Sequence, residues 1–165
     1  MFILFKRLQH LRRLAALPAP ANGGSLALRH VDCGSCNGCE HEITNAAGPH
    51  YDLDRFGLSI VASPRHADVL LITGSITTRM VEPLRAAYAA MPEPRLVAAL
   101  GDCALGVGVI SDPAQLAGSV DDILPIDIRI PGCPPTPTAI ADALVTAIDL
   151  ARQPQGITPE LQRRA

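Results

Sequence analysis

The chain has 165 residues and a formal net charge of −2, with 48% apolar, 18% charged and 3% aromatic residues. This length is enough for one domain with its own core, so disulfide bonds are not needed to stabilise the fold. The charge balance gives no broad basic field, and the few aromatic residues offer no stacking patch for bases, so we do not expect nucleic acid as a partner.

Residues 1–24 are predicted to form a basic, amphipathic segment followed by a linker. Leu4, Leu8, Leu11 and Ala15 recur at helical spacing, with lysine and arginine residues between them. We expect this segment to lie on a membrane surface or to dock on a partner; the alternative is a frayed basic tail. A secretory signal is disfavoured, because the apolar stretch that follows the arginines is short and broken by proline.

Residues 25–152 alternate short apolar runs with helical patterns, which predicts an open, mostly parallel β-sheet with helices on its faces. The predicted strands and helices are, in chain order, a strand at 26–31, a helix at 40–47, strands at 58–62 and 69–73, a helix at 82–90, strands at 95–100 and 126–130, and a helix from about residue 136. The tail at 153–165 is predicted to be flexible, and no run is long and apolar enough to cross a membrane.

All five cysteines lie in loops that leave predicted strands. Cys33, Cys36 and Cys39 follow the first strand, Cys103 follows the fourth, and Cys133 follows the fifth. The loops that leave the carboxyl ends of parallel strands share one edge of the sheet, and ligands bind at that edge. We therefore expect cysteines that are distant in the sequence to converge there.

Thiolates placed in this way could bind an iron–sulfur cluster, bind zinc or pair as disulfides. The Cys-x-x-Cys spacing serves both iron–sulfur and zinc sites. A zinc ribbon would repeat a close pair later in the chain, whereas the later cysteines are single. Disulfides are rare in cytosolic proteins, and an odd number of cysteines cannot all pair within one chain.

The residues around the single cysteines favour a cluster. Gly101 and Gly132 stand just upstream of them, and we expect these glycines to let the backbone approach a bulky inorganic core and donate N–H groups to its sulfurs. Cys133 is followed by Pro134, as in the Cys-Pro ending of bacterial ferredoxin motifs. Inert buried cysteines would explain any one position, but not five positions in loops rich in glycine and proline.

Five motifs carry a resemblance to a known family: "DCGSCNGCEHEI", "DRFG", "SPRHADVLLITGS", "GDCA" and "PGCPPTP". In this order they resemble the small subunit of membrane-associated NiFe hydrogenases related to formate hydrogenlyase, energy-converting and CO-induced hydrogenases. They are also similar to the complex I subunit that holds the last cluster before quinone. The resemblance covers about residues 31–150, nearly all of the predicted folded part.

The resemblance implies a flavodoxin-like domain that holds one 4Fe-4S cluster at the carboxyl edge of its strands. Carried over by motif, the ligands are Cys36, Cys39, Cys103 and Cys133, which leaves Cys33 as the spare; this choice rests on the match alone. The complex I relatives have two adjacent cysteines in the first motif. The Cys-Asn-Gly-Cys found here favours the hydrogenase branch.

A cluster held by cysteines alone moves single electrons and makes no bonds. The resemblance therefore implies an electron-transfer subunit, peripheral on the cytoplasmic face of the cell membrane. Its implied partners are a NiFe-hydrogenase-type large subunit that carries the bond-making centre, a ferredoxin-like iron–sulfur subunit and membrane-arm subunits. The alternatives are a complex I-like quinone oxidoreductase subunit and a zinc-stabilised or metal-free flavodoxin-like adaptor.

Glu42 matches an acidic position in both groups of relatives. We expect it to fix the subunit interface or to lie on a proton route beside the cluster. The alternative is a carboxylate favoured by the first turn of a helix.

Overall fold

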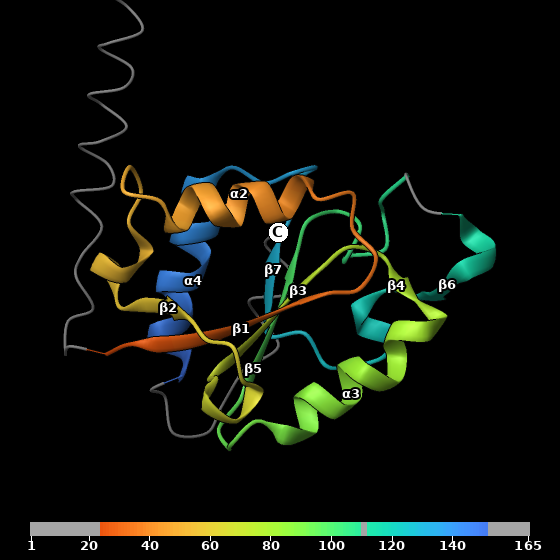
Figure 1. Ribbon diagram of the computed structural model, residues 1–165, viewed down its shortest axis with the longest axis horizontal. Helices are drawn as coiled ribbons and strands as arrows, with labels where there is room; N and C mark the ends of the chain where they lie inside the picture. The colour runs from red at the N-terminus through yellow and green to blue at the C-terminus, as the bar shows by residue number, and fades with distance from the viewer. Residues whose placement is uncertain (1–23, 110–111, 152–165) are drawn as a thin grey trace, which may run out of the picture.

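A five-stranded parallel sheet forms the centre of the protein (Figure 1). The structure is a computed structural model that describes residues 24–109 and 112–151, with side chains described up to residue 146. The strands of this sheet are β1 (Leu26–Asp32), β2 (Leu58–Ile60), β3 (Val69–Thr73), β5 (Leu96–Leu100) and β7 (Ile128–Ile130). Their spatial order is β2-β1-β3-β5-β7, and every neighbouring pair is parallel. This is the strand order of flavodoxin-like folds, so the predicted fold class is confirmed.

Helices cover both faces of the sheet (Figure 1). Helices α2 (Gly38–Ala47) and α4 (Pro137–Ala151) lie against one face, and α3 (Val81–Ala90) lies against the other. Strands β3 and β5 are buried along their whole length, because a parallel sheet with helices on both faces leaves its central strands no exposed side.

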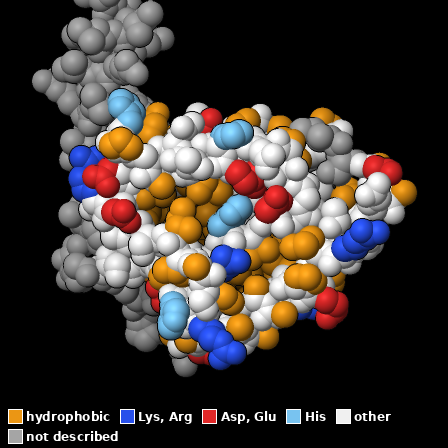
Figure 2. Space-filling view, viewed as in Figure 1, with side chains coloured by type: hydrophobic (Ala, Val, Ile, Leu, Met, Phe, Trp, Pro, Cys, Tyr) orange, Lys and Arg blue, Asp and Glu red, His pale blue; other side chains and the backbone are white. Residues whose placement is uncertain are grey.

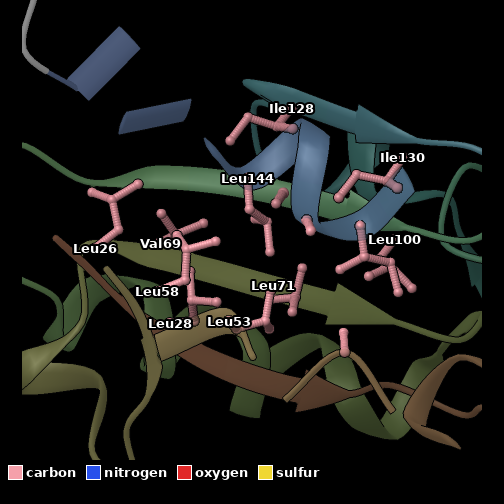
Figure 3. Packing of buried hydrophobic residues seen from close by; sticks show 14 of the residues in the cluster. Leu26, Leu28, Leu53, Leu58, Val69, Leu71, Leu100, Ile128, Ile130 and Leu144 are labelled. Atoms are coloured by element: carbon pink, nitrogen blue, oxygen red, sulfur yellow. The ribbon is translucent and has the colours of Figure 1, made fainter. Parts of the chain in front are cut away.

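The apolar side chains of the central strands divide between two cores. Val69 and Leu71 point toward α2 and α4, where they meet Leu144 of α4 (Figure 3). Leu70 and Ile72 point the other way and belong to the core beneath α3. The alternation follows from the two-residue period of a strand, so a single apolar run supplies both cores.

The remaining elements are short. An antiparallel pair, β4 (Ile76–Thr77) and β6 (Leu116–Gly118), stands beside the main sheet. The 3₁₀ turns are η1 (Leu53–Phe56), η2 (Pro64–His66), η3 (Thr78–Met80), η4 (Pro113–Gln115) and η5 (Val120–Asp122). The sequence patterns predicted neither the pair nor these turns, because elements of two to four residues show no periodicity.

The predicted elements are confirmed, with differences at their ends. The predicted strand at 126–130 begins only at Ile128. Just before it, the carboxylate of Asp127 accepts the backbone N–H of Val97 at 2.8 Å, and the N–H of Asp127 donates to the carbonyl of Val97 at 2.9 Å. The last helix begins at Pro137, as expected, and the hydroxyl of Thr136 accepts the N–H of Ala139 at 3.3 Å.

The predicted amphipathic segment and the predicted flexible tail lie outside the described residues, apart from Gly24, and stay predictions. None of the helices in the described part of the chain is long and apolar enough to cross a membrane.

Candidate metal centre

The ends of three strands bring four cysteines to one cavity. Cys36 and Cys39 come from the loop after β1 and the first turn of α2, Cys103 follows β5, and Cys133 follows β7. All four line a cavity of about 190 Å³. The other lining residues are Ser35, Gly38, Gly74, Asp102, Gly132 and Pro134. The predicted convergence at the carboxyl edge of the sheet is therefore confirmed, whereas the role of these cysteines as ligands stays a prediction.

Cys33 takes no part in this cavity. Its side chain is fully buried in the core beneath α3, and burial raises the pKa of its thiol to about 12, with a smaller contribution from Asp32. Its backbone N–H donates to the carbonyl of Thr73, and its carbonyl accepts the N–H of Thr77. Cys33 is thus a buried core residue, and its assignment as the spare cysteine of the motif stays a prediction.

The loop between Cys33 and Cys36 turns on Asp32. One carboxylate oxygen of Asp32 accepts the backbone N–H groups of Gly34 and Ser35 at 2.9 and 2.8 Å. This is a local turn of the kind that aspartate favours at strand ends. The turn carries the chain away from the buried Cys33 and out to the exposed Cys36.

Gly101 makes room for Cys39, but the N–H groups of Gly101 and Gly132 have other partners than predicted. Gly101 has a φ of +90°, and a Cβ there would lie 2.6 Å from Sγ of Cys39. The N–H of Gly101 donates to the carbonyl of Ile130 at 2.8 Å, and the N–H of Gly132 donates to the carboxylate of Asp102 at 2.7 Å. The prediction that these two N–H groups serve cluster sulfurs is therefore wrong.

Asp102 joins the two loops that carry the single cysteines. Its carboxylate accepts the N–H of Gly132, and its own N–H donates to the carbonyl of Gly132 at 2.9 Å. This reciprocal pair fixes the spacing between Cys103 and Cys133. Asp102 was not predicted as a site residue, although it directly precedes Cys103 in the "GDCA" motif.

A partly buried polar network anchors the amino end of α2 to the sheet. Asn37 precedes the helix in a left-handed conformation and gives it no side-chain cap. Glu40, next to Cys39, instead accepts the hydroxyl of Thr73 at the end of β3. Because that hydroxyl has only one proton, the ring N–H at Nε2 of His30 is left to donate to Thr73 Oγ1, 2.8 Å away.

Burial determines the charge of His30 in this network. Burial lowers the pKa of His30, and the carboxylate of Glu40 opposes this shift, so the imidazole is neutral near pH 7. The second carboxylate oxygen of Glu40 is buried and has no hydrogen-bond partner within the described part of the chain. Glu42, singled out in the sequence, is half-buried two residues further along α2, and its expected role stays a prediction.

The four cysteines provide soft sulfur donors that favour a positive group between them. Burial raises the pKa of Cys39 to about 12, and Glu40 and the other three thiols add to the shift. Burial also raises the pKa of Cys103, and a hydrogen bond from Ser75 opposes this. Such thiols bind protons tightly, so thiolates form here only when metal cations replace those protons.

The arrangement suits a cluster better than one ion. In residues 24–109 and 112–146, no three or more His, Cys, Asp or Glu side chains are arranged so that they could hold a single metal ion. The four thiols surround a cavity instead, and each cysteine of a Cys₄-bound 4Fe-4S cluster binds a different iron atom. The residues present therefore fit such a cluster, with one cysteine for each iron.

Comparison with known proteins agrees with this site. The chain is 44% identical over 131 residues to the probable membrane-bound hydrogenase subunit mbhJ of Pyrococcus furiosus, covering 79% of this chain and 78% of that protein. It is 44% identical over 123 residues to formate hydrogenlyase subunit 7 of Escherichia coli, covering 74% of this chain and 48% of that protein. It therefore spans about half the length of the second relative.

A solved structure also has a fold similar to that of this chain. The fold resembles a chain in the structure of the membrane-bound sulfane sulfur reductase, an archaeal respiratory membrane complex, with a TM-score of 0.68 and 30% identity. The match covers 79% of this chain and 72% of that chain.

Residues 36–147, more than half of the 165 residues, match the family described as NADH ubiquinone oxidoreductase, 20 Kd subunit. The chain therefore belongs to the NADH ubiquinone oxidoreductase 20 Kd subunit family.

Proposed function

We propose that this chain is the electron-transfer subunit of a membrane-associated NiFe hydrogenase complex, and that it binds one 4Fe-4S cluster through Cys36, Cys39, Cys103 and Cys133. The observation that carries the proposal is the convergence of these four cysteines on one cavity. When bound, such a cluster accepts and donates single electrons. Four of the ten residues that line the cavity are cysteines, which supply the sulfur ligands that such a cluster needs.

The residues around the cavity hold the ligands in place. Asp102 fixes the loops of Cys103 and Cys133 to each other, and the contact of Glu40 with Thr73 holds the turn of α2 that carries Cys39. Supporting hydrogen bonds of this kind orient ligands at metal sites. Cys36 and Cys133 are exposed, whereas Cys39 and Cys103 are half-buried. One side of the site is thus open to a partner, and the other side is closed by the sheet.

The partners that we propose are a NiFe-type large subunit, a ferredoxin-like iron–sulfur subunit and membrane-arm subunits. The names of the two relatives, a membrane-bound hydrogenase subunit and a formate hydrogenlyase subunit, support this choice. Figure 2 shows apolar side chains gathered in a hollow of the surface, with acidic side chains at its rim. Val107 and Val109, in the loop after Cys103, are 68% and 92% exposed. Exposed apolar surface of this kind supports contact with other subunits. The peripheral place that we propose on the cytoplasmic side of the cell membrane rests on the relatives that are named as membrane-bound.

A second candidate is a subunit of a complex I-like quinone oxidoreductase, which the description of the matched family favours. The fold and the cluster would be the same, and the difference would lie in the large partner subunit.

Metal analysis of the native complex separates these candidates. We expect the complex, isolated anaerobically through a tag on this chain, to contain iron together with nickel in a one-to-one ratio to the large subunit. Iron without nickel, with the large subunit present, would favour quinone reduction. Zinc in place of iron, or no metal, would contradict electron transfer by this chain.

A further inference from the structure

The carboxyl end of β3 carries no cysteine, yet its residues contact two of the cysteine-bearing segments. The hydroxyl of Thr73 donates to Glu40, beside Cys39. Two residues further along the chain, the hydroxyl of Ser75 makes a hydrogen bond with Cys103, a contact between two loops that are distant in the sequence. Residues at the carboxyl end of β3 and just after it therefore contact the site without supplying a proposed ligand.

Ser75 is held firmly in place. It is 4% exposed, and it is one of only two polar residues among those described as buried. The turn before it is tight, since Gly74 has a φ of +76° and a Cβ there would lie 2.5 Å from the backbone N of Ser35. The loop after β1 also packs on Ser75, because a Cβ on Gly34 would lie 2.9 Å from the carbonyl oxygen of Ser75. The backbone therefore leaves Ser75 little room to move away from Cys103.

Ser75 and Cys103 also line a second cavity of about 330 Å³, together with Leu105, Leu116 and Ser119. Cys103 thus lines both cavities, whereas Ser75 lines the second cavity and is not among the residues that line the four-cysteine cavity. Ser75 therefore contacts Cys103 without being part of the lining of the proposed cluster site.

We propose that Ser75 is a positioning residue that donates a hydrogen bond to the sulfur of Cys103 and thereby raises the reduction potential of the cluster. This inference rests on the proposed function. Reduction adds negative charge to the cluster and its sulfur ligands, so a donated hydrogen bond stabilises the reduced form more than the oxidised form. Hydrogen bonds to the sulfurs are one of the factors that set the potential of such clusters.

The test is a redox titration of the intact complex, monitored by electron paramagnetic resonance. Ser75→Ala removes the hydroxyl, and Ser75→Thr keeps it. Ser119→Ala is the matched control, because Ser119 lines the same second cavity but its hydroxyl donates to Asp122 at 2.9 Å.

We expect Ser75→Ala to lower the reduced-to-oxidised ratio at a fixed ambient potential by about tenfold, a negative shift of about 59 mV for a one-electron couple. Ser75→Thr should restore the wild-type potential, and Ser119→Ala should leave it unchanged. If Ser75→Ala binds no cluster while Ser75→Thr does, the positioning role of the hydroxyl is supported.

Two results would overturn the inference. The first is an unshifted potential in Ser75→Ala with the cluster present. The second is loss of the cluster in both Ser75 variants, since side-chain volume rather than the hydroxyl would then govern the site. A wild-type complex with no 4Fe-4S signal would instead contradict the proposed function.

Discussion

We expect the replacement of Cys39 by alanine to remove about four iron atoms from each complex and to abolish electron transfer between H₂ and an acceptor. Cys39 is a proposed ligand, with Gly101 against its sulfur and the other three thiols around it. Loss of a residue that only supports a metal ligand lowers metal affinity or activity by about 10- to 100-fold, so loss of a ligand should exceed that range. Iron content and H₂-dependent dye reduction measure the two effects.

The control for this variant is Cys33→Ala, which changes a cysteine of the same motif. Cys33 is fully buried outside the cavity, so its replacement should lower the free energy of unfolding by about 1 kcal/mol and leave the iron content unchanged. Loss of iron from Cys33→Ala with retention in Cys39→Ala would reverse the ligand assignment, because the pair would then be Cys33 and Cys36.

Gly101→Ala should lose the cluster although no ligand is changed. Gly101 has a φ of +90°, a conformation that costs about 1–2 kcal/mol for a residue with a Cβ. The added Cβ would also lie 2.6 Å from the sulfur of Cys39, and Cys39 would have to move. We expect the iron content per folded chain to fall by more than half.

Gly57→Ala is the matched control for Gly101→Ala. Gly57 has a φ of +77°, and its added Cβ would lie 2.7 Å from the carbonyl oxygen of Gly24, far from the cysteines along the strands. This variant should lose stability in thermal unfolding but keep its iron per folded chain. Equal loss of iron in both variants would mean that general instability, and not the contact with Cys39, empties the site.

The sequence predicted the sheet well because its strands are buried on both faces. The run at Val69–Thr73 is apolar throughout, and the structure places a strand at the same residues. The order of the strands in the sheet could not be predicted from these patterns. Periodicity does not encode which strands are neighbours, so the flavodoxin-like order followed only from the resemblance and was then confirmed by the pairing.

The cysteines of the candidate site could be predicted, but most of their polar partners could not. Convergence of the cysteines requires only that each follows a parallel strand. The contact of Glu40 with Thr73 joins residues 33 apart, and that of Asp102 with Gly132 joins residues 30 apart. Such contacts depend on strand register and on the direction of each side chain, which the sequence pattern does not specify. For the same reason the partners of the glycine N–H groups were predicted wrongly.

The most direct test of the proposed cluster site is to locate the metal in the intact complex by anomalous X-ray diffraction. Data would be collected on both sides of the iron and zinc absorption edges. We expect an iron signal in the cavity between Cys36, Cys39, Cys103 and Cys133, and no metal beside Cys33. Zinc at this position, or iron bound elsewhere in the chain with this cavity empty, would contradict it.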